Sequence, residues 1–292
     1  MARTIHFKGT PLTLVGRSLK NGMLAPDFRV VDQDLKEVSL AAFKGSVKIL
    51  TSFPSLDTPV CDLQVKEFNK KAAVLSKDAA IIGISKDLPF AQARFCRDNN
   101  ITNISVLSDY RYSSFGINYG LLIKELNLLC RSVIIADKND VIRYIQIIDE
   151  LTTPPNYDDV LNNLKDILQM PESDALEELS SRCAPCGGRA APLPKETVDR
   201  LLSQSPGWQL IEDKRISKEF KCKDFVEAKY FLDMVSEVAQ AQSHHPAMAI
   251  IYNKIKITLT THAAGGLTEN DFTMARIIDE MEDINGKSCN FS

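Results

Sequence analysis

The stretch "VKILTSFPSLDTPVCDL" (residues 47–63) decides the fold of the first half of the chain. Its first seven residues form a β-branched and apolar run that is typical of a buried strand. From Val60 onward, apolar residues recur at helical spacing, and Cys61 falls in the first turn of the predicted helix. The stretch therefore predicts a strand, a short loop and a helix that carries a thiol near its N-terminal end.

The alternation of strand and helix signals continues over residues 1–168. Strands are predicted over 79–85, 132–137 and 141–148, and helices over 88–100 and 156–168. The segment "KND" predicts a hairpin turn between the last two strands, and "KGTP" predicts another near the N-terminus. This order predicts a mixed α/β sheet that is covered by helices.

The composition changes after residue 168. Residues 169–181 are acidic and polar, which is typical of a linker. Residues 182–292 predict an α+β domain on an antiparallel sheet. Its helices are expected over 197–204, 224–242 and 268–282, and its strands over 208–213, 215–221, 247–252 and 255–262.

The overall composition is that of a globular protein. The chain has 292 residues, 44% of them apolar, a formal net charge of −3 and no block of Lys or Arg. Neither nucleic acid nor an anionic membrane is therefore an expected partner. No apolar run is long enough to span a bilayer and the N-terminus lacks a secretory signal, so a cytoplasmic protein is expected. Seven cysteines do not suit a structural disulfide framework.

Cys61 is the first candidate reactive group. The free N–H groups and the dipole at a helix N-terminus favour a thiolate, which is a nucleophile able to attack a peroxide O–O bond. No histidine lies nearby in sequence, so activation would come from the helix end, the hydroxyl of Thr58 and a cation such as Arg131. The alternative is a buried cysteine with a purely structural role.

The surroundings of Cys61 resemble the thiol peroxidases, which are atypical two-cysteine peroxiredoxins. The matching motifs cover essentially all of residues 1–168 and read "APDF" (25–28), "PSLDTPVCDLQVKEFN" (54–69), "SKDLPFAQARFC" (85–96), "VLSDYR" (106–111), "FGINYGLLI" (115–123) and "RSVIIADKNDVIRYIQIIDELTTPPNYDDVL" (131–161). The resemblance implies a thioredoxin-like fold, with Cys61 as the peroxidatic and Cys96 as the resolving cysteine. It also implies that Thr58 and Arg131 polarise the peroxide and that thioredoxin is the reductant.

The two cysteines lie on different predicted helices, with Cys96 expected in mid-helix. A disulfide requires Cα atoms within about 7 Å, so the reduced fold is not expected to hold the two cysteines in bonding range. Local unwinding around Cys96 is therefore predicted in every turnover. Cys130 lies on an apolar strand and is predicted to be a core residue.

A second cluster gathers three of the four histidines of the chain, namely His244, His245 and His262. The last two flank a predicted hairpin with the two-residue turn Asn253–Lys254. In that register Tyr252 pairs with Ile255.

This register places His262 opposite His245, on the polar face of the hairpin, with His244 just before the strand. Three imidazoles can bind zinc, although adjacent histidines usually point apart. They can also perform general acid–base catalysis on a neutral ring-shaped substrate. The third alternative is a set of surface histidines with no chemical role.

The same region resembles pterin-4a-carbinolamine dehydratases. The matching motifs are "SHHPAMAIIYNKIKITLTTHAAGGLTENDFTMA" (243–275), "RCAPCGGRAAPL" (182–193) and "SPGW" (205–208). The resemblance implies that His244, His245 and His262 are active-site histidines and that Asp271 binds substrate. It implies loss of water from a 4a-hydroxytetrahydropterin without a metal or another cofactor.

Two positions depart from that family pattern. Gln240 replaces an acidic or similar polar residue, and Met248 replaces an aromatic residue. A glutamine can hydrogen-bond an imidazole, but it cannot stabilise the imidazolium by charge. These departures predict either lowered turnover or a domain that has become a binding module.

The pair Cys183 and Cys186 allows three interpretations. A zinc ribbon would require a second pair, and a thioredoxin-like redox pair should lie between a strand and a helix. The interpretation that we favour is a family motif that packs the N-terminus of the second domain. Cys222 and Cys289 show no partner, and these two cysteines and His6 are assigned no role.

The sequence thus predicts a fused, bifunctional enzyme. The first half would be a thiol-dependent hydroperoxide reductase and the second half a pterin carbinolamine dehydratase. The rival hypothesis keeps the peroxidase and makes the second half a dimerisation or adaptor module. Both families form oligomers, so at least a homodimer is expected.

Overall fold

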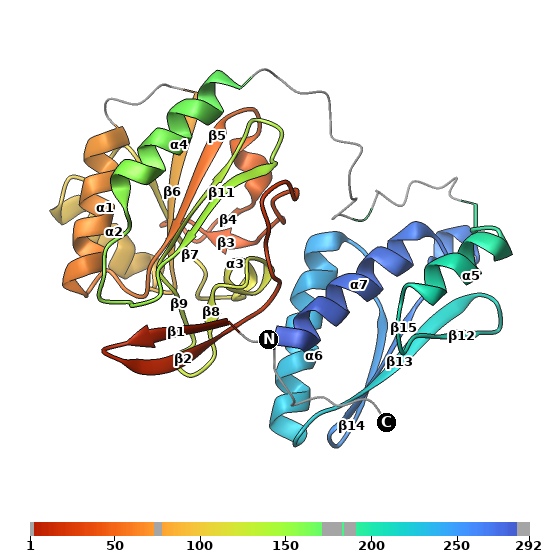
Figure 1. Cartoon of the computed structure of the whole chain (residues 1–292). Coiled ribbons are helices and arrows are strands. Elements are labelled where there is room, and N and C mark those ends of the chain that lie inside the picture. Colours follow the sequence, from red (N-terminus) through yellow and green to blue (C-terminus); the bar gives the residue numbers. More distant parts are fainter. Residues whose placement is uncertain (1–2, 73–77, 171–182, 184–190, 285–292) are drawn as a thin grey trace. The chain divides into compact units, whose positions relative to one another are not determined.

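The computed structural model describes residues 3–72, 78–170, 183 and 191–284. The chain divides into two compact units, one with residues 3–179 and the other with residues 180–292 (Figure 1). Within the described residues, none of the helices has the length and apolar character needed to cross a membrane.

The N-terminal unit is built on a seven-stranded sheet with the order β11-β10-β5-β6-β7-β3-β4. Its central strands β5, β6 and β7 are parallel, and the other pairings are antiparallel. The elements of this sheet and its helices are β3 (Val30–Val31), β4 (Glu37–Val38), η1 (Leu40–Phe43), β5 (Val47–Ser52), α1 (Pro59–Ala72), β6 (Ala79–Ser85), α2 (Pro89–Asp98), β7 (Ser105–Ser108), α3 (Ser114–Asn118), β10 (Ser132–Ala136), β11 (Ile142–Ile147) and α4 (Tyr157–Gln169).

The core of this unit explains the sequence pattern around residue 47. Alternate side chains of β5, such as Val47 and Ile49, pack with Phe68 of α1 and Leu164 of α4. Both faces of β5 are buried, so the neighbouring apolar residues Ile49 and Leu50 are both inaccessible, and the buried Lys48 is paired with Asp140 at 2.6 Å. Helices α1 and α4 therefore cover one face of the sheet, as Figure 1 shows.

A second, four-stranded sheet lies at one end of this unit, with the order β1-β2-β8-β9. Its strands are β1 (Arg3–Phe7), β2 (Thr10–Val15), β8 (Leu122–Ile123) and β9 (Leu128–Leu129). Phe7 pairs with Thr10 around Lys8 and Gly9, both of which have positive φ, so the predicted N-terminal hairpin is confirmed.

The C-terminal unit is a four-stranded antiparallel sheet, β12-β13-β15-β14, with its helices on one face (Figure 1). Its elements are α5 (Lys195–Ser203), β12 (Gln209–Ile211), β13 (Arg215–Lys221), α6 (Phe225–Gln242), β14 (Ala247–Ile251), β15 (Lys254–Leu259), η2 (His262–Ala264) and α7 (Glu269–Ile284). Ile255, Ile257 and Leu259 point to the helices and are buried. The predicted α+β fold with an antiparallel sheet is confirmed.

The predicted register of the histidine hairpin is wrong by two residues. Ile251 pairs with Lys254 and Ile250 with Ile255, so the turn falls on Tyr252 and Asn253. The cause is Asn253, whose side-chain amide donates to the carbonyl of Cys222 at 2.8 Å and whose own carbonyl accepts the Cys222 N–H at 2.8 Å. A shift of two residues keeps the same faces, so the alternation along β15 is as predicted.

Candidate active sites

Cys61 is the third residue of α1, and its side chain is fully buried. The Thr58 hydroxyl lies 2.8 Å from the sulfur and also 3.0 Å from the carbonyl oxygen of Ser55. The Arg131 guanidinium donates to the same sulfur through Nη2 at 3.3 Å. Two donors directed at one buried sulfur stabilise negative charge on it.

Arg131 is held rigidly, because it is only 1% exposed and most of its donors have acceptors within the fold. Its Nε and Nη2 groups donate to the carbonyl of Leu151 at 3.2 and 2.8 Å. Its Nη1 group donates to Oε1 of Gln64, and Gln64 in turn donates to Oγ1 of Thr51 at 2.6 Å. This chain of contacts fixes the guanidinium in front of the sulfur.

Gln64 was not predicted as a site residue. It is fully buried on α1, one turn after Cys61, and therefore on the same face of the helix. The signal available in the sequence was a glutamine three residues after the candidate nucleophile, one turn further along the predicted helix. Burial also raises the pKa of nearby Tyr157 to about 12, against the positive charge of Arg131, so this phenol stays neutral.

Cys96 lies in the last turn of α2, which corrects the expected mid-helix position. Both Cys61 and Cys96 are free thiols, and both belong to a core cluster that includes Phe53 and Val65. Burial raises the pKa of the Cys96 thiol, partly offset by a hydrogen bond from Gln33. Cys96 is therefore a neutral thiol in this state.

Cys130 is fully buried, as predicted, and desolvation raises its pKa to about 12. Cys222 is disulfide-bonded, which corrects the expectation that it has no partner. Cys186 and Cys289 lie outside the described residues.

In the C-terminal unit, His244 and Asp271 form a buried pair. The Nε2 atom of His244 lies 2.8 Å from Oδ1 of Asp271. The other carboxylate oxygen accepts from the Thr261 hydroxyl at 2.9 Å and from the Thr268 N–H at 2.8 Å. Asp271 thus caps helix α7 and orients the His244 ring at the same time.

The other two histidines are exposed. The Nε2 atom of His245 lies 3.2 Å from Oε1 of Gln240, so the glutamine that departs from the family pattern does contact an imidazole. His262 lies in η2, after the end of β15, so the predicted pairing of His245 with His262 across the hairpin is wrong. The residue before His262, Thr261, donates its hydroxyl to Asp271, so His262 directly follows a residue that contacts the His244–Asp271 pair.

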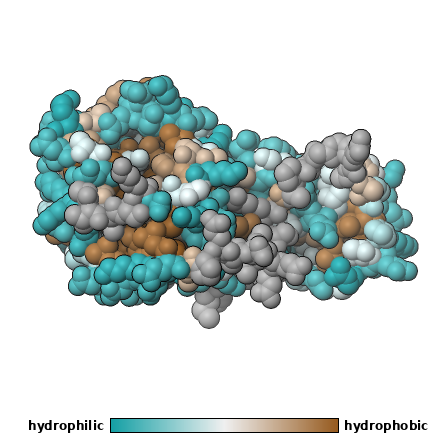
Figure 2. Space-filling view, turned by 90° about the horizontal axis from the view of Figure 1, so that it is seen from above, coloured by the Kyte–Doolittle hydropathy of each residue, from teal (hydrophilic) through white to brown (hydrophobic). Residues whose placement is uncertain are grey.

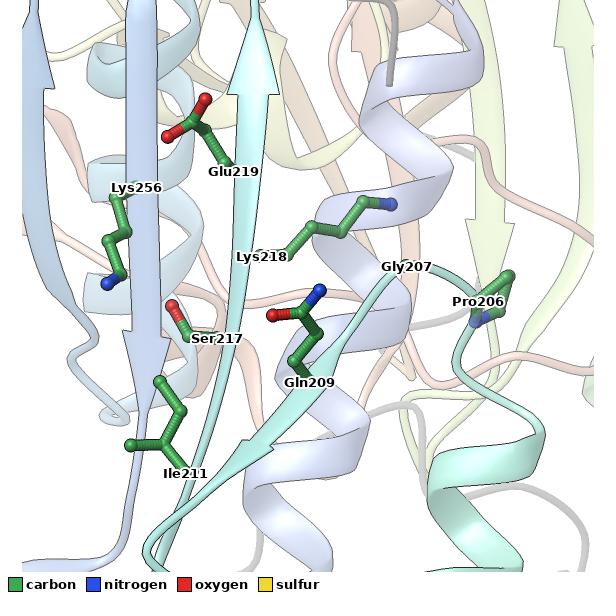
Figure 3. Close-up of a pocket in the computed structure, with 8 residues that line it drawn as sticks. All are labelled: Pro206, Gly207, Gln209, Ile211, Ser217, Lys218, Glu219 and Lys256. Carbon is green, nitrogen blue, oxygen red and sulfur yellow. The ribbon is translucent and has the colours of Figure 1, made fainter. Parts of the chain in front are cut away.

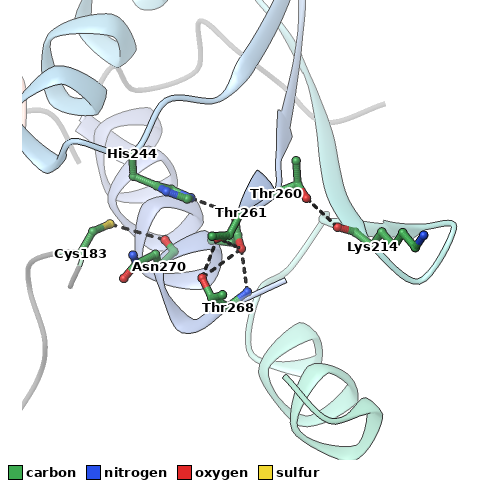
Figure 4. A network of polar contacts seen from close by, with 8 residues as sticks. Cys183, Lys214, His244, Thr260, Thr261, Thr268 and Asn270 are labelled. Carbon is green, nitrogen blue, oxygen red and sulfur yellow. Dashed lines mark hydrogen bonds and ion pairs between the residues drawn. The ribbon is translucent and has the colours of Figure 1, made fainter. Parts of the chain in front are cut away.

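Cys183 lies beside this network (Figure 4). Its backbone N–H donates to Oε1 of Gln242 at 2.8 Å, and its sulfur lies 3.6 Å from the carbonyl of Asn270. Gln242 ends α6 just before His244, and Asn270 precedes Asp271. Cys183 therefore contacts both segments that carry the buried pair.

Residues 20–161 match the redoxin family. A thiol peroxidase of Bacillus subtilis is 47% identical over 165 residues, which are 56% of this chain and 98% of that protein. One from Staphylococcus haemolyticus is 45% identical over 163 residues, again 98% of its length. The chain belongs to the thiol peroxidase family.

Solved structures agree with this family assignment. A peroxiredoxin-like protein from Aquifex aeolicus is 44% identical with a TM-score of 0.54, and the match covers 57% of this chain and 98% of that one. A thiol peroxidase from Chromobacterium violaceum, 22% identical with a TM-score of 0.53, shows the shared fold over 58% of this chain. The thioredoxin-like fold of the thiol peroxidase domain is therefore confirmed.

Residues 191–281 match a different family, pterin 4 alpha carbinolamine dehydratase. The thiol peroxidase domain is thus followed by a pterin dehydratase domain on its own antiparallel sheet. The match includes His244, His245, His262 and Asp271.

The dehydratase domain also has a cavity of about 470 Å³ on its sheet (Figure 3). Its lining comes from Pro206, Gly207, Gln209, Ile211, Ser217, Lys218, Glu219 and Lys256, none of which is a predicted site residue. The Lys218 side chain points away from the others, toward α7, where it donates to Asp279 at 2.8 Å. Figure 2 shows hydrophilic side chains around the edges of the face in view.

Among the residues that the structure describes, no group of three His, Cys, Asp or Glu side chains is arranged to hold a metal ion.

Proposed function

We propose that the chain is a bifunctional enzyme that reduces hydroperoxides and dehydrates 4a-hydroxytetrahydropterins. The observation that carries the first activity is the contact of the Thr58 hydroxyl and the Arg131 guanidinium with the buried Cys61 sulfur. Membership of the thiol peroxidase family supports the same activity.

In the first step, the Cys61 thiolate attacks one peroxide oxygen. The O–O bond breaks, Cys61 becomes a sulfenic acid, and the other oxygen leaves as an alkoxide or hydroxide that takes up a proton. Arg131 and Thr58 are placed to stabilise the charge that moves onto the leaving oxygen. The products are the sulfenic acid and one molecule of alcohol or water.

In the second step, the Cys96 thiol condenses with the sulfenic acid and releases water. The resulting Cys61–Cys96 disulfide is then reduced by the dithiol of a thioredoxin, which becomes oxidised. Because Cys96 lies in the last turn of α2, only the end of that helix needs to unwind for the bond to form.

The dehydratase reaction needs a base at a ring nitrogen and an acid at the departing hydroxyl group. His244, held by Asp271, and the exposed imidazoles of His245 and His262 are the groups proposed for these proton transfers. The products are a quinonoid dihydropterin and water. The family match over residues 191–281 supports this assignment.

The second candidate function for residues 180–292 is a dimerisation or adaptor module. Gln240 favours it, because this neutral side chain contacts His245 where a carboxylate would stabilise the imidazolium. The peroxidase activity is the same under both hypotheses. A homo-oligomer and a cytoplasmic location stay predictions from the sequence.

Peroxide-dependent oxidation of thioredoxin by the whole chain tests the first activity. We expect Cys61→Ser to abolish it, and Cys96→Ser to consume peroxide once without steady turnover. Cys183→Ser is the matched control, because Cys183 is a free cysteine of the other compact unit, and it should retain activity. Full activity in Cys61→Ser would refute the proposal.

Dehydration of a 4a-hydroxytetrahydropterin by wild type and by His245→Ala tests the second activity. The enzyme hypothesis predicts activity in the wild type that falls in the variant. The adaptor hypothesis predicts no activity in either protein above the uncatalysed rate.

A further inference from the structure

The end of α2 that carries Cys96 is held by two side chains from other elements, Gln33 and Asn69. Gln33 lies in the turn between β3 and β4, and Asn69 lies on α1, further along that helix than Cys61. In the described structure, neither side chain contacts Cys61 or one of the two groups that stabilise its sulfur. Both residues therefore act on the resolving thiol and not on the peroxidatic one.

The turn that carries Gln33 has a fixed backbone. The Asp32 carboxylate accepts from the N–H groups of Asp34 and Lys36, both at 2.9 Å. The Asp32 N–H in turn donates to the Lys36 carbonyl at 2.9 Å. A turn closed around one carboxylate in this way leaves little freedom to the residues inside it. Gln33, which lies between these bonds, presents its side chain from a rigid position.

Strand pairing brings this turn beside Cys96. Val31, just before the turn, pairs with Ser108 of β7 in antiparallel fashion. Because antiparallel strands run in opposite directions, the chain continues from Val31 toward the part of β7 that contains Val106. Val106 and Cys96 belong to the same apolar cluster. From this position the Gln33 side chain hydrogen-bonds the Cys96 thiol, which partly offsets the rise in its pKa caused by burial.

Asn69 holds the segment that directly follows α2. Its Oδ1 atom accepts from the N–H groups of Thr102 at 3.0 Å and Asn103 at 2.8 Å. Its Nδ2 group donates to the Asn100 carbonyl at 3.4 Å, and the Asn103 side chain donates back to the Asn69 carbonyl at 3.2 Å. These four bonds tie the segment after α2 to α1.

That segment is bonded to Cys96. The Ile101 N–H donates to the Cys96 carbonyl at 2.9 Å, and Ile101 packs in the same apolar cluster. Cys96 is thus held through its side chain by Gln33 and through its backbone by the segment that Asn69 fixes. Both Cys61 and Cys96 are free thiols in this state, and a disulfide requires an S–S distance of about 2 Å. The Cys96 sulfur must therefore leave Gln33 before it can bond to Cys61.

We propose that Gln33 and Asn69 are positioning residues that retain Cys96 in its reduced place, and so set how long the Cys61 sulfenic acid persists before the disulfide forms. The inference rests on the proposed roles of Cys61 and Cys96. While the sulfenic acid persists, a second hydroperoxide can oxidise it to a sulfinic acid, with release of an alcohol or water. The two contacts therefore decide the partition between disulfide and sulfinic acid.

The rate of disulfide formation tests the proposal. It is measured after addition of one equivalent of hydrogen peroxide, by acid quenching, alkylation of the remaining thiols and mass spectrometry. We expect Gln33→Leu and Asn69→Ala each to speed disulfide formation about threefold, the factor for a weak net hydrogen bond. The double variant should be about ninefold faster, because the two residues share no partner. The rate constant of Cys61 oxidation should stay within about twofold of the wild type.

The partition between products gives a second measurement. At a fixed excess of hydrogen peroxide, the fraction of Cys61 found as sulfinic acid should fall about threefold in each single variant. A residue whose variant forms the disulfide at the wild-type rate or more slowly does not retain Cys96. That result in both variants would overturn the proposal.

Three further variants separate retention of Cys96 from general destabilisation. Asn69→Asp keeps an acceptor for the two N–H groups and should match the wild type. Asp34→Ala changes an exposed side chain of the same turn that has no contact with Cys96 in the described structure, and it should also match. Asp137→Asn weakens three hydrogen bonds just after β10 and should lower only the melting temperature. Acceleration in Asp137→Asn equal to that in Gln33→Leu would refute a specific retention.

The contact between Gln33 and the thiol has a test of its own. The NMR chemical shift of the Cys96 Cβ atom is followed against pH in a Cys61→Ser background. Because the hydrogen bond from Gln33 lowers the pKa of the Cys96 thiol, Gln33→Leu should raise that pKa. Asn69→Ala should leave it unchanged, since Asn69 acts on the backbone. An unchanged titration in Gln33→Leu would remove Gln33 from the proposal.

These outcomes are distinct from a failure of the proposed function. If Cys96→Ser sustained turnover with thioredoxin at the wild-type rate, the assignment of Cys96 as the resolving cysteine would be wrong. If Cys96→Ser stops turnover while Gln33→Leu and Asn69→Ala behave like the wild type, only the retention of Cys96 is wrong.

Discussion

The two sites of this molecule differ in how completely the chain surrounds its reactive groups. Cys61 is fully buried, and a hydroxyl and a guanidinium contact its sulfur. In the dehydratase domain only His244 is buried with a partner, whereas His245 and His262 are exposed. The Cys61 site therefore has its charge-stabilising groups in place before substrate binds. In the dehydratase site, only the His244 ring is buried and held by a contact with Asp271.

This difference follows from the chemistry proposed for each site. A small peroxide brings few contacts of its own, so the fold must supply the charge stabilisation through fixed groups such as Arg131. A pterin ring is large enough to bury exposed imidazoles when it binds, so these side chains can lie at the surface beforehand. Activity should therefore depend more steeply on buried contacts in the first site than on exposed ones in the second.

The largest effect is expected for Arg131→Lys. Lysine keeps the charge but cannot bond the Leu151 carbonyl, Gln64 and the Cys61 sulfur together, as the guanidinium does. We expect the rate constant for Cys61 oxidation to fall about 100-fold, the usual cost of one misplaced transition-state donor. Rapid-mixing kinetics with hydrogen peroxide measures it.

Arg143→Lys is the control for this variant. Arg143 lies on β11 and forms an ion pair with Asp137. In the described structure it has no contact with Cys61. Its rate constant should match the wild type. Equal losses in the two variants would show that the geometry around the sulfur is not what sets the rate.

A smaller effect is expected for Asp271→Asn in the dehydratase domain. An amide cannot accept from His244, Thr261 and Thr268 at the same time, as the carboxylate does. We expect dehydratase activity to fall about 20-fold, in line with the loss of a hydrogen bond to a charged group. Unchanged peroxidase activity in the same preparation confirms that the other domain is intact.

Asp279→Asn is the control on the same helix. Asp279 accepts from Trp208 and Lys218 but does not contact His244 in the described structure. It should lower the melting temperature of the dehydratase domain without lowering activity per folded molecule. Loss of activity in this variant as large as in Asp271→Asn would remove the special role of the His244–Asp271 pair.

Gln240→Glu is expected to have a still smaller effect, and in the opposite direction. Gln240 contacts exposed His245, so a carboxylate there would stabilise the imidazolium through a solvent-screened interaction. Turnover by the dehydratase domain should rise about threefold, because exposed charge pairs contribute little. If the domain is an adaptor, the substitution will produce no measurable turnover.

The smallest effect concerns acid stability of the thiol peroxidase domain. Hydrogen bonds from the Thr152 side chain, and then from the backbone of Lys8, Thr152 and Gly9, lower the pKa of Glu150 to about 2. Because the folded-state pKa is depressed, this stabilisation is present above the ordinary pKa of 4.5 and is lost as the pH falls toward 2. Glu150→Gln should therefore show a weaker loss of stability between these pH values, measured by thermal unfolding. An identical pH dependence in both proteins would contradict this assignment.

The sequence predicted those parts of the molecule that depend on local pattern. The apolar run that begins at residue 47 and the order of strand and helix signals predicted the α/β and the α+β fold correctly. Cys61 lies in the first turn of α1, as expected. The hairpin register was wrong because it depends on Asn253 and its contact with Cys222, which is thirty-one residues away. Pairing at such a distance leaves no periodic signal.

The site residues could likewise be predicted only where their contacts are local in sequence. Thr58 is close to Cys61 in sequence and contacts it through a local turn, which a sequence can indicate. Gln64 acts through its contact with Arg131, which is far from it in sequence, and this contact exists only once the chain has folded. A polar residue one helical turn from a candidate nucleophile is the pattern in the sequence that indicates such a contact.

The identity of the oxidised sulfur tests the central claim most directly. The Cys96→Ser variant is treated with one equivalent of hydrogen peroxide in the presence of a reagent that traps sulfenic acids, and its peptides are analysed by mass spectrometry. The account predicts the adduct on the peptide that contains Cys61, with the other cysteines unmodified. An adduct on another cysteine, with Cys61 unmodified, would contradict it.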